Sequence, residues 1–392
     1  MLVRSPQRYL KRNNRTNVRQ WKMKDGNQKS EHPIAILRLL PRVRETSAPF
    51  NQFSLAWSER RNITLVTYFS SDLNPPKDLT VFEGDGSLPG FFRALRDAVA
   101  DKEYDIIHAH ASHLGLLLIG ASLFMRRKFM AGTVFTVHNS YRSYKLRNRL
   151  MLIPVFTFFQ RVVCCGSASF ESFPGFFKRL AGGRLCFVPN GLDIGRIDQA
   201  ASNTHEYLRN GGFTIVTVSR LIKIKNLDTV LKAFQQSADQ TSRLVLIGEG
   251  DLRNLLTAEI NECGLGERAE LKGLIPREKV YEHLLKADLF ISASRGEGLP
   301  VATLEAMACR CPVILSDIKP HREIAAGVDF VPLIQPDDTP GFAREIKKYR
   351  QMSSAKRAEI GERCRRLVEE RFSLTTMHKR YEEVYAQVMV KY

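Results

Sequence analysis

Two glutamates eight positions apart, Glu297 and Glu305, are side chains that could hold a polar ligand. Glu297 lies in a turn that contains Gly296 and Gly298, and Glu305 lies about one helical turn inside the segment that follows. A turn that leads into a helix presents free backbone N–H groups, which bind anions. A carboxylate accepts hydrogen bonds from hydroxyl groups. Together these groups predict a ligand that carries both phosphate and sugar hydroxyls.

The residues around the two glutamates predict a strand, a turn, a helix and a second strand. The apolar run 288–292 is the first strand, and Pro300 is expected as the first helical residue. A helix over 301–309 and a strand over 312–316 complete the unit. The alternative is an ordinary turn with two solvated glutamates.

A second cluster of candidate residues is cationic. Arg220 and Lys225 follow a predicted strand that ends at 219–220, and a helix begins near Asn226. Two cations beside a helix N-terminus could neutralise a diphosphate, and arginine can donate two N–H groups to it. The alternative is that both are solvated loop charges. A further turn, Gly248-Glu249-Gly250, follows the next predicted strand.

Histidines close two predicted strands of the N-terminal half. His110 ends the strand 104–110, and His138 ends the segment TVFTVH. His108 and His110 share one face of their strand, but no third ligand accompanies them, so a metal site is not predicted. For His138 the alternative is a hydrogen-bonded histidine at a strand end.

Length and composition indicate a globular protein of two domains. The chain has 392 residues with 44% hydrophobic and 26% charged residues. The longest apolar run, 114–125, is too short to cross a bilayer, and the first thirty residues lack the apolar region of a secretory signal. The seven cysteines have no metal-ligand or disulfide spacing, which favours reduced thiols in a cytoplasmic protein.

The net charge of +18 indicates an anionic partner. Because no nucleic-acid-binding motif is present, an anionic membrane surface or a phosphate-bearing substrate is favoured over nucleic acid. Residues 1–30 are basic and predicted to be disordered. They are either an electrostatic membrane contact or an artefact of a start codon assigned upstream of Met23.

A basic and apolar stretch predicts a peripheral contact with the inner face of the membrane. Cations at 126–128 and at Arg142, Lys145, Arg147 and Arg149 flank the apolar run 150–159. Basic residues beside exposed apolar ones form an interfacial anchor. The alternative is that 150–159 is buried core.

Strands alternate with helices along the chain, which predicts the fold class α/β with two Rossmann-like domains and doubly wound parallel sheets. Ligands bind beyond the carboxyl ends of such strands. The expected domains are 31–196, on the acceptor side, and 213–372, on the donor side, joined by a linker at 197–212. A final helix over 373–392 is expected to pack back on the first domain. The expected strands cover 34–39, 62–68, 104–110, 133–139, 161–167, 186–191, 214–220, 243–248, 269–273, 288–292, 312–316 and 330–333.

The segment EGLPVATLEAMA, with its flanking strands, resembles the donor site of family 4 glycosyltransferases of the GT-B fold. Arg220 and Lys225 are similar to the phosphate-binding pair of that family, and His138 matches a position near the transferred sugar. Gly248-Glu249-Gly250 resembles a turn near the nucleotide, and 188–193 resembles the hinge between the domains. The resemblance covers nearly all of residues 130–325 and weakens before that.

The resemblance implies transfer of a sugar from a nucleoside-diphosphate sugar to a hydroxyl acceptor, with retention and without a cofactor or essential metal. The acceptor would be lipid-linked or a saccharide, in polysaccharide, lipopolysaccharide or glycolipid assembly. The implied catalytic residues are His138, Arg220, Lys225 and Glu297. The implied donor-binding residues are Gly248, Glu249, Gly250, Gly298, Leu299, Pro300, Val301 and Glu305. Residues expected on the acceptor side are Asn51, His110 and Asn139.

The chain departs from the family pattern in two places. The loop 44–51 contains no glycine where many members have a Gly-Gly pair, and Gly298-Leu299-Pro300 stands where many have Gly-Phe-Gly. Two alternative functions therefore remain. One is a related GT-B enzyme, such as a sugar-nucleotide epimerase or a glucan synthase. The other is a non-catalytic subunit that binds a nucleotide-sugar.

Overall fold

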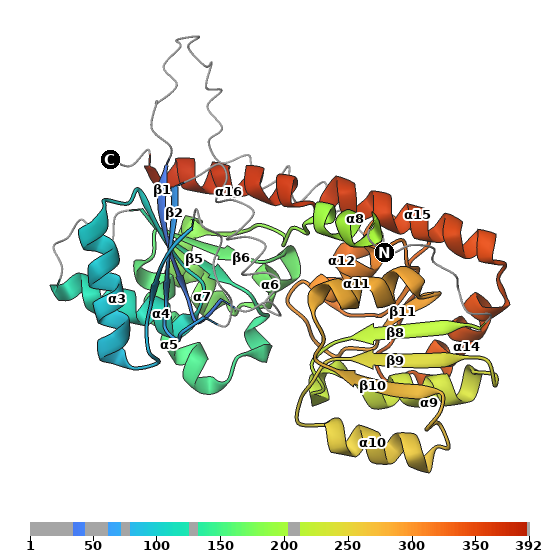
Figure 1. The fold of residues 1–392 in the computed structure, drawn as a ribbon. Helices are drawn as coiled ribbons and strands as arrows, with labels where there is room; N and C mark the ends of the chain where they lie inside the picture. Colours follow the sequence, from blue (N-terminus) through green and yellow to red (C-terminus); the bar gives the residue numbers. More distant parts are fainter. Residues whose placement is uncertain (1–33, 44–61, 72–78, 125–131, 203–211, 390–392) are drawn as a thin grey trace, which may run out of the picture. The chain divides into compact units, whose positions relative to one another are not determined.

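The structure, a computed structural model, describes residues 34–43, 62–71, 79–124, 132–202 and 212–389. These residues form two parallel β-sheets with helices packed against them (Figure 1). The predicted fold class, two Rossmann-like domains in an α/β protein, is confirmed. The basic segment 1–30, Asn51 and the loop 44–51 lie outside the described residues.

The first sheet has the strand order β3-β2-β1-β4-β5-β6-β7, and all its neighbouring strands are parallel. The five central strands of this sheet are buried along most of their length because helices cover them, whereas the two edge strands are partly exposed. The strands are β1 (Ala35–Leu40), β2 (Asn62–Thr67), β3 (Thr80–Glu83), β4 (Ile106–Ala109), β5 (Thr133–Val137), β6 (Arg161–Cys164) and β7 (Leu185–Phe187). The helices between them are α3 (Leu88–Asp101), α4 (Ser112–Phe124), α5 (Leu146–Phe158), α6 (Ser167–Ser172) and α7 (Gly175–Ala181).

The second sheet has the order β10-β9-β8-β11-β12-β13 and is also parallel. Its strands are β8 (Thr214–Val218), β9 (Arg243–Ile247), β10 (Ala269–Gly273), β11 (Leu289–Ser292), β12 (Val313–Ser316) and β13 (Leu333–Ile334). The helices that accompany them are α8 (Ile194–Ser202), α9 (Leu227–Ser237), α10 (Arg253–Glu262), α11 (Arg277–Lys286), α12 (Val301–Ala308), α13 (Lys319–Ile324), α14 (Thr339–Gln351) and α15 (Ser354–Arg371).

The last helix, α16 (Leu374–Met389), belongs to the core of the first domain. Its buried residues Tyr381 and Val384 pack with Ile36, Leu65 and Val134 on one face of the first sheet. The chain reaches this face through a short contact in which Leu192 N donates to Phe372 O at 2.8 Å and Leu374 N donates to Leu192 O at 3.0 Å. Both connections between the domains therefore meet at residue 192.

Three predicted boundaries differ from the structure. The linker was predicted at 197–212, but Ile197 and Ala200 belong to α8 and pack in the core of the second domain. Pro300 precedes α12 instead of starting it, because its ψ of 101° is extended. The strand expected over 330–333 is the two-residue β13, which pairs only with β12.

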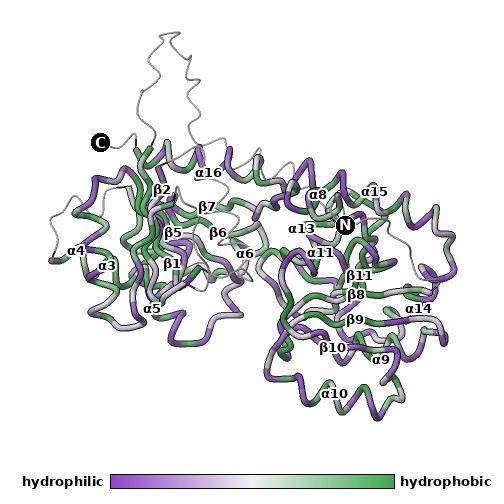
Figure 2. The backbone as a smooth tube through the Cα atoms, in the orientation of Figure 1, coloured by the Kyte–Doolittle hydropathy of each residue, from purple (hydrophilic) through white to green (hydrophobic). Residues whose placement is uncertain are grey.

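Hydropathy follows the layers of each domain. Hydrophobic colouring concentrates in the strands, and hydrophilic and hydrophobic bands alternate along α15 and α16 (Figure 2). Such bands are expected for helices that bury one face only. No helix among the described residues is long and apolar enough to span a membrane.

Candidate functional site

The second sheet changes its winding direction between β8 and β11, which neighbour each other although two strands separate them in the chain. Ligands of open α/β sheets bind beyond the carboxyl ends of the strands at such a point. The loop after β8 carries Arg220 and Lys225, and the loop after β11 carries Glu297. The topology thus brings together two groups of residues that lie about seventy positions apart.

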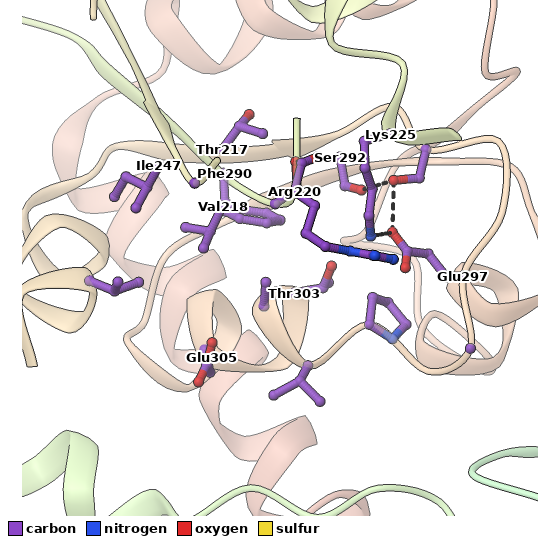
Figure 3. Close-up of a pocket in the computed structure, with 18 of the residues that line it drawn as sticks. Thr217, Val218, Arg220, Lys225, Ile247, Phe290, Ser292, Glu297, Thr303 and Glu305 are labelled. Carbon is purple, nitrogen blue, oxygen red and sulfur yellow. Dashed lines mark hydrogen bonds and ion pairs between the residues drawn. The ribbon is translucent and has the colours of Figure 1, made fainter. Parts of the chain in front are cut away.

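A charged cluster joins these two loops. Lys225 Nζ lies 2.5 Å from Glu297 Oε1, and Ser294 Oγ donates a 2.8 Å hydrogen bond to the same oxygen. Both ionic side chains are mostly buried, with 16% and 11% of their surface exposed. The backbone bond from Arg295 N to Ile224 O, 2.8 Å long, fixes one loop against the other. Arg220 reaches toward this pair from the end of β8 (Figure 3).

The turn after β9 approaches the β8 loop closely enough to require glycine. Gly248 has φ of 140°, and a Cβ there would lie 1.9 Å from Ser219 O. A Cβ on Gly250 would lie 2.5 Å from Leu221 O. Glu249 lines the same pocket, and its carboxylate pairs with Arg253 of α10 at 2.5 Å.

Glu305 lies at the other end of the pocket, on α12 (Figure 3). Its side chain is fully buried and accepts a 2.9 Å hydrogen bond from Arg277 Nη1 and a 3.4 Å bond from the hydroxyl of Tyr281. Burial raises the pKa of Glu305, whereas the charge of Arg277 acts in the opposite direction. The carboxylate is thus held in place before any ligand binds.

The turn after β11 also touches the first domain. A Cβ on Gly298 would lie 2.4 Å from His138 O and 3.2 Å from Cys165 Sγ, so this position admits only glycine. Leu299 is buried, and its carbonyl accepts a 3.5 Å hydrogen bond from the amide of Asn190. Leu299, Pro300 and Val301 line the pocket together with His138 and Asn139.

The histidines of the first domain form a buried row behind His138. His110 Nδ1 lies 3.1 Å from His138 Nε2, and the ring of His108 stacks on that of His110 with centroids 4.1 Å apart. His108 in turn contacts the hydroxyl of Tyr385 on α16 at 2.7 Å. Burial lowers the pKa of His138 to about 4 and that of His110 well below its usual range, so both are neutral at neutral pH.

The pocket has a volume of about 580 Å³ and gathers most of the predicted site residues. All four catalytic candidates line it, as do Asn139 and seven of the eight donor-binding candidates. The exception is Gly250, which does not line the pocket. His110 contacts the pocket through His138, and Asn51 lies outside the described residues. A volume of this size suits a ligand such as a nucleotide-sugar.

Other lining residues were not predicted from the sequence. Ser294 could have been found, because a hydroxyl three residues before a glutamate in a turn is a natural hydrogen-bond partner. Arg277 and Thr217 carried no such signal, because their partners lie 28 and 74 positions away in the chain. Within the described ranges, no group of three histidine, cysteine, aspartate or glutamate side chains is arranged to hold a metal ion.

Two family models match adjacent parts of the chain. The model described as Glycosyltransferase Family 4 matches residues 61–196, and the model described as Glycosyl transferases group 1 matches residues 202–367. The second match contains Arg220, Lys225, Glu297 and Glu305. The chain belongs to the GT-B glycosyltransferases of the family 4 type. The resemblance seen in the sequence is therefore confirmed.

Two curated relatives of this glycosyltransferase have names that include a lipid, diphospho-undecaprenol in one and diacylglycerol in the other. One is the N-acetylgalactosamine-N,N'-diacetylbacillosaminyl-diphospho-undecaprenol 4-alpha-N-acetylgalactosaminyltransferase of Campylobacter jejuni, 30% identical over 40% of this chain and 42% of the relative. The other is the alpha-monoglucosyldiacylglycerol synthase of Streptococcus pneumoniae, 26% identical over 57% of this chain and 54% of the relative. The chain thus matches about half of the length of each relative.

A similar solved structure is that of Anabaena HepE in complex with UDP and glucose. It superposes with a TM-score of 0.73 over 91% of this chain and 100% of that chain, at 19% sequence identity. HepE has also been solved with UDP-glucose. This likeness establishes a shared fold.

Proposed function

We propose that this glycosyltransferase moves a sugar from a nucleoside-diphosphate sugar to a hydroxyl acceptor with retention of configuration. The observation that supports this proposal is that two cations and two carboxylates of the second domain line one pocket. The cations are Arg220 and Lys225, and the carboxylates are Glu297 and Glu305. Cations suit the diphosphate, and carboxylates suit hydroxyl groups. Glu297 would hold the hydroxyls of the transferred sugar, and Glu305 those of the ribose.

In the proposed reaction the bond between the sugar C1 and the diphosphate oxygen breaks, and the acceptor oxygen bonds to C1 on the same face. The acceptor proton goes to the leaving diphosphate, so the products are a nucleoside diphosphate and a glycoside. Arg220 and Lys225 would stabilise the charge that develops on the leaving group. His138, neutral at neutral pH, would donate or accept a hydrogen bond near the transferred sugar.

The first donor to test is UDP-glucose, which HepE binds in its solved complex. In a panel of UDP-, GDP- and ADP-sugars, the sugars of one nucleotide should raise the melting temperature of the protein. The protein should also release the nucleoside diphosphate from one of these sugars. Binding without release of nucleoside diphosphate, with or without an acceptor, would favour a binding subunit. Conversion of the donor into an epimer would favour a sugar-nucleotide epimerase.

Catalysis is proposed to need no metal, because Arg220 and Lys225 supply the positive charge that a metal supplies in other transferases. Turnover should therefore continue in a strong chelator such as EDTA. Turnover that stops in EDTA and returns with manganese or magnesium would overturn this part of the proposal.

The proposed acceptor is lipid-linked or close to a membrane, and the surface that supports this choice is α5 with the turn before it. Leu146, Leu150 and Phe158 of α5 are 70%, 57% and 57% exposed, whereas Leu152 and Phe156 are buried. The apolar run 150–159 is thus partly core and partly surface. Arg142, Lys145 and Arg147 are exposed beside it, and residues 141–159 contain no carboxylate. This surface suits an anionic lipid headgroup layer.

Liposome co-sedimentation tests the membrane contact. Each basic residue near an anionic surface contributes about 1 kcal/mol, so binding should be reversible and weaken with salt. Replacing Arg142, Lys145, Arg147 and Arg149 by serine should abolish binding to anionic vesicles. As a control, Arg243, Lys279 and Lys356 of the second domain are replaced by serine, which should leave binding to anionic vesicles largely unchanged. Equal binding to neutral and anionic vesicles, or no binding, would contradict the proposal.

A further inference from the structure

Arg277 contacts Glu305 directly, and none of the family patterns in the sequence includes Arg277. It is the first residue of α11 and lines the pocket with 12% of its side chain exposed. Its Nη1 atom donates to Glu305 Oε2 at 2.9 Å, and Tyr281, one turn later on α11, donates to Glu305 Oε1 at 3.4 Å. One helix thus supplies a hydrogen bond to each oxygen of the carboxylate.

Because Glu305 is buried, its carboxylate needs partners that stabilise its charge. A carboxylate with no exposed surface loses its hydration, and burial then favours its protonated form. A protonated carboxyl is a poorer acceptor for the two hydroxyls of a ribose than a carboxylate is. The nearby charges that oppose protonation are those of Arg277 and, at longer range, Arg196 of α8. Arg277 is the nearer of the two, since it contacts the carboxylate directly.

The Glu305 carboxylate also has acceptor sites that its two protein partners do not use. Each carboxylate oxygen has two acceptor sites, so one bond from Arg277 and one from Tyr281 leave capacity for two hydroxyl donors. Glu305 and Arg277 line the pocket together with Val280 and Thr303, whereas Arg196 does not.

We propose that Arg277 is a positioning residue for the ribose of the donor: it keeps Glu305 charged and oriented, and so makes the pocket selective for nucleotides with intact ribose hydroxyls. This inference rests on the proposed function, because it assigns the ribose to Glu305. It adds to the proposed function a residue of a different element, α11. It also adds a property of the pocket, which is discrimination against deoxyribose.

The test measures ribose discrimination by calorimetry. The nucleoside diphosphate that binds most tightly among UDP, GDP and ADP is compared with its 2′-deoxy and 3′-deoxy forms. In the unaltered protein, removing a hydroxyl that Glu305 holds should weaken binding about ten- to hundredfold. In Arg277→Met, the affinity for the ribonucleotide should fall by a similar factor, and the deoxy forms should bind about as well as the ribo form.

Further variants separate positioning from folding. Arg277→Met together with Glu305→Gln removes both charges, so it should restore the stability lost in the single variant without restoring discrimination. Arg277→Lys keeps the charge and should restore part of the affinity. Lys279→Met, on the same helix with a 62% exposed side chain, is the matched control and should leave discrimination unchanged.

The outcomes distinguish this inference from the proposed function. If the unaltered protein binds none of the nucleotides, the proposed function fails. If the unaltered protein discriminates against the deoxy forms and Arg277→Met discriminates equally well, or binds more tightly, the role of Arg277 is overturned. If the unaltered protein binds the ribonucleotide and its deoxy forms with equal affinity, the proposed role of Arg277 is also overturned.

Discussion

At the scale of single residues, four charged groups of the pocket form two ion pairs in the structure. Lys225 pairs with Glu297, and Arg277 pairs with Glu305. Each pair joins residues of different elements and so holds two parts of the pocket together. Paired and mostly buried charges need little reorganisation when a ligand arrives, which favours preorganised stabilisation of charge.

Replacing Lys225 by alanine should weaken binding of the donor about tenfold or more, because a cation proposed to contact the diphosphate is lost and Glu297 loses its partner. Calorimetry with the preferred nucleotide measures the change. Lys223→Ala is the matched control, since Lys223 is exposed and lies two residues earlier in the same turn. Equal affinity of Lys225→Ala and the unaltered protein would contradict the role of Lys225.

Residue types and spacing predicted those residues of the pocket that belong to one continuous sequence motif. Glu297, Gly298 and Glu305 belong to one continuous motif, and the structure brings that motif to the pocket. The partners of these residues were not predictable in the same way. Arg277 contacts Glu305, and Asn190 contacts Leu299, only because the fold brings distant parts of the chain together.

At the scale of elements, strands β4 and β5 carry a row of neutral histidines under α16. His108, His110 and His138 contact one another in sequence, and the row ends at Tyr385. The bond between His110 and His138 joins two neutral rings, so one nitrogen donates and the other accepts. This bond therefore couples the tautomer of His138, in the pocket, to that of His110, which does not line the pocket.

The histidine row should make the protein unstable in mild acid. Burial lowers the pKa of His138 from 6.5 to about 4, so between these values the unfolded state binds more protons than the folded state. The stability is complete above about pH 6.5 and is lost as the pH falls toward 4, by about 3 kcal/mol for His138 alone. Urea unfolding at several pH values measures this loss. His138→Asn should make it smaller, and an unchanged pH dependence in that variant would contradict the explanation.

The turn after β11 should be sensitive to one added methyl group. Gly298→Ala would place a Cβ 2.4 Å from His138 O, so the turn or the strand end of β5 must shift. Sugar transfer should fall about tenfold or more, because overpacking costs about 1–3 kcal/mol at a site shared by both domains. Gly296→Ala is the matched control, since its Cβ would meet only the end of the Ile224 side chain. Equal transfer rates in both variants would show that the close approach is unimportant.

At the scale of the whole molecule, the alternation of strands and helices predicted both sheets, but the bounds of the linker between the domains were predicted wrongly. The predicted linker began at 197, where the structure has α8 in the core of the second domain. The polar composition of that segment reflects the exposed face of an amphipathic helix. Its two apolar anchors, Ile197 and Ala200, are too few to identify a helix from the pattern alone.

The role of α16 gives the last prediction. The core of the second domain is formed by its own elements apart from Cys165 and Leu192, whereas the core on one face of the first sheet is completed by α16. A change on the buried side of α16 should therefore destabilise the first domain and leave the donor pocket of the second largely intact. Val384 is 6% exposed and packs in this core, and Gln387 is on the exposed side of the helix.

Val384→Asp should lower the free energy of unfolding of the first domain by several kcal/mol, because it places an unpaired carboxylate in an apolar core. Unfolding should then separate into two transitions, and a nucleotide should raise the temperature of the later one only. Sugar transfer should be lost, because it needs His138 of the first domain in place, while the nucleotide still binds. Gln387→Asp should keep one transition and full transfer. A Val384→Asp protein that unfolds in one step, or that loses nucleotide binding along with transfer, would show that the two domains are stabilised as a single unit.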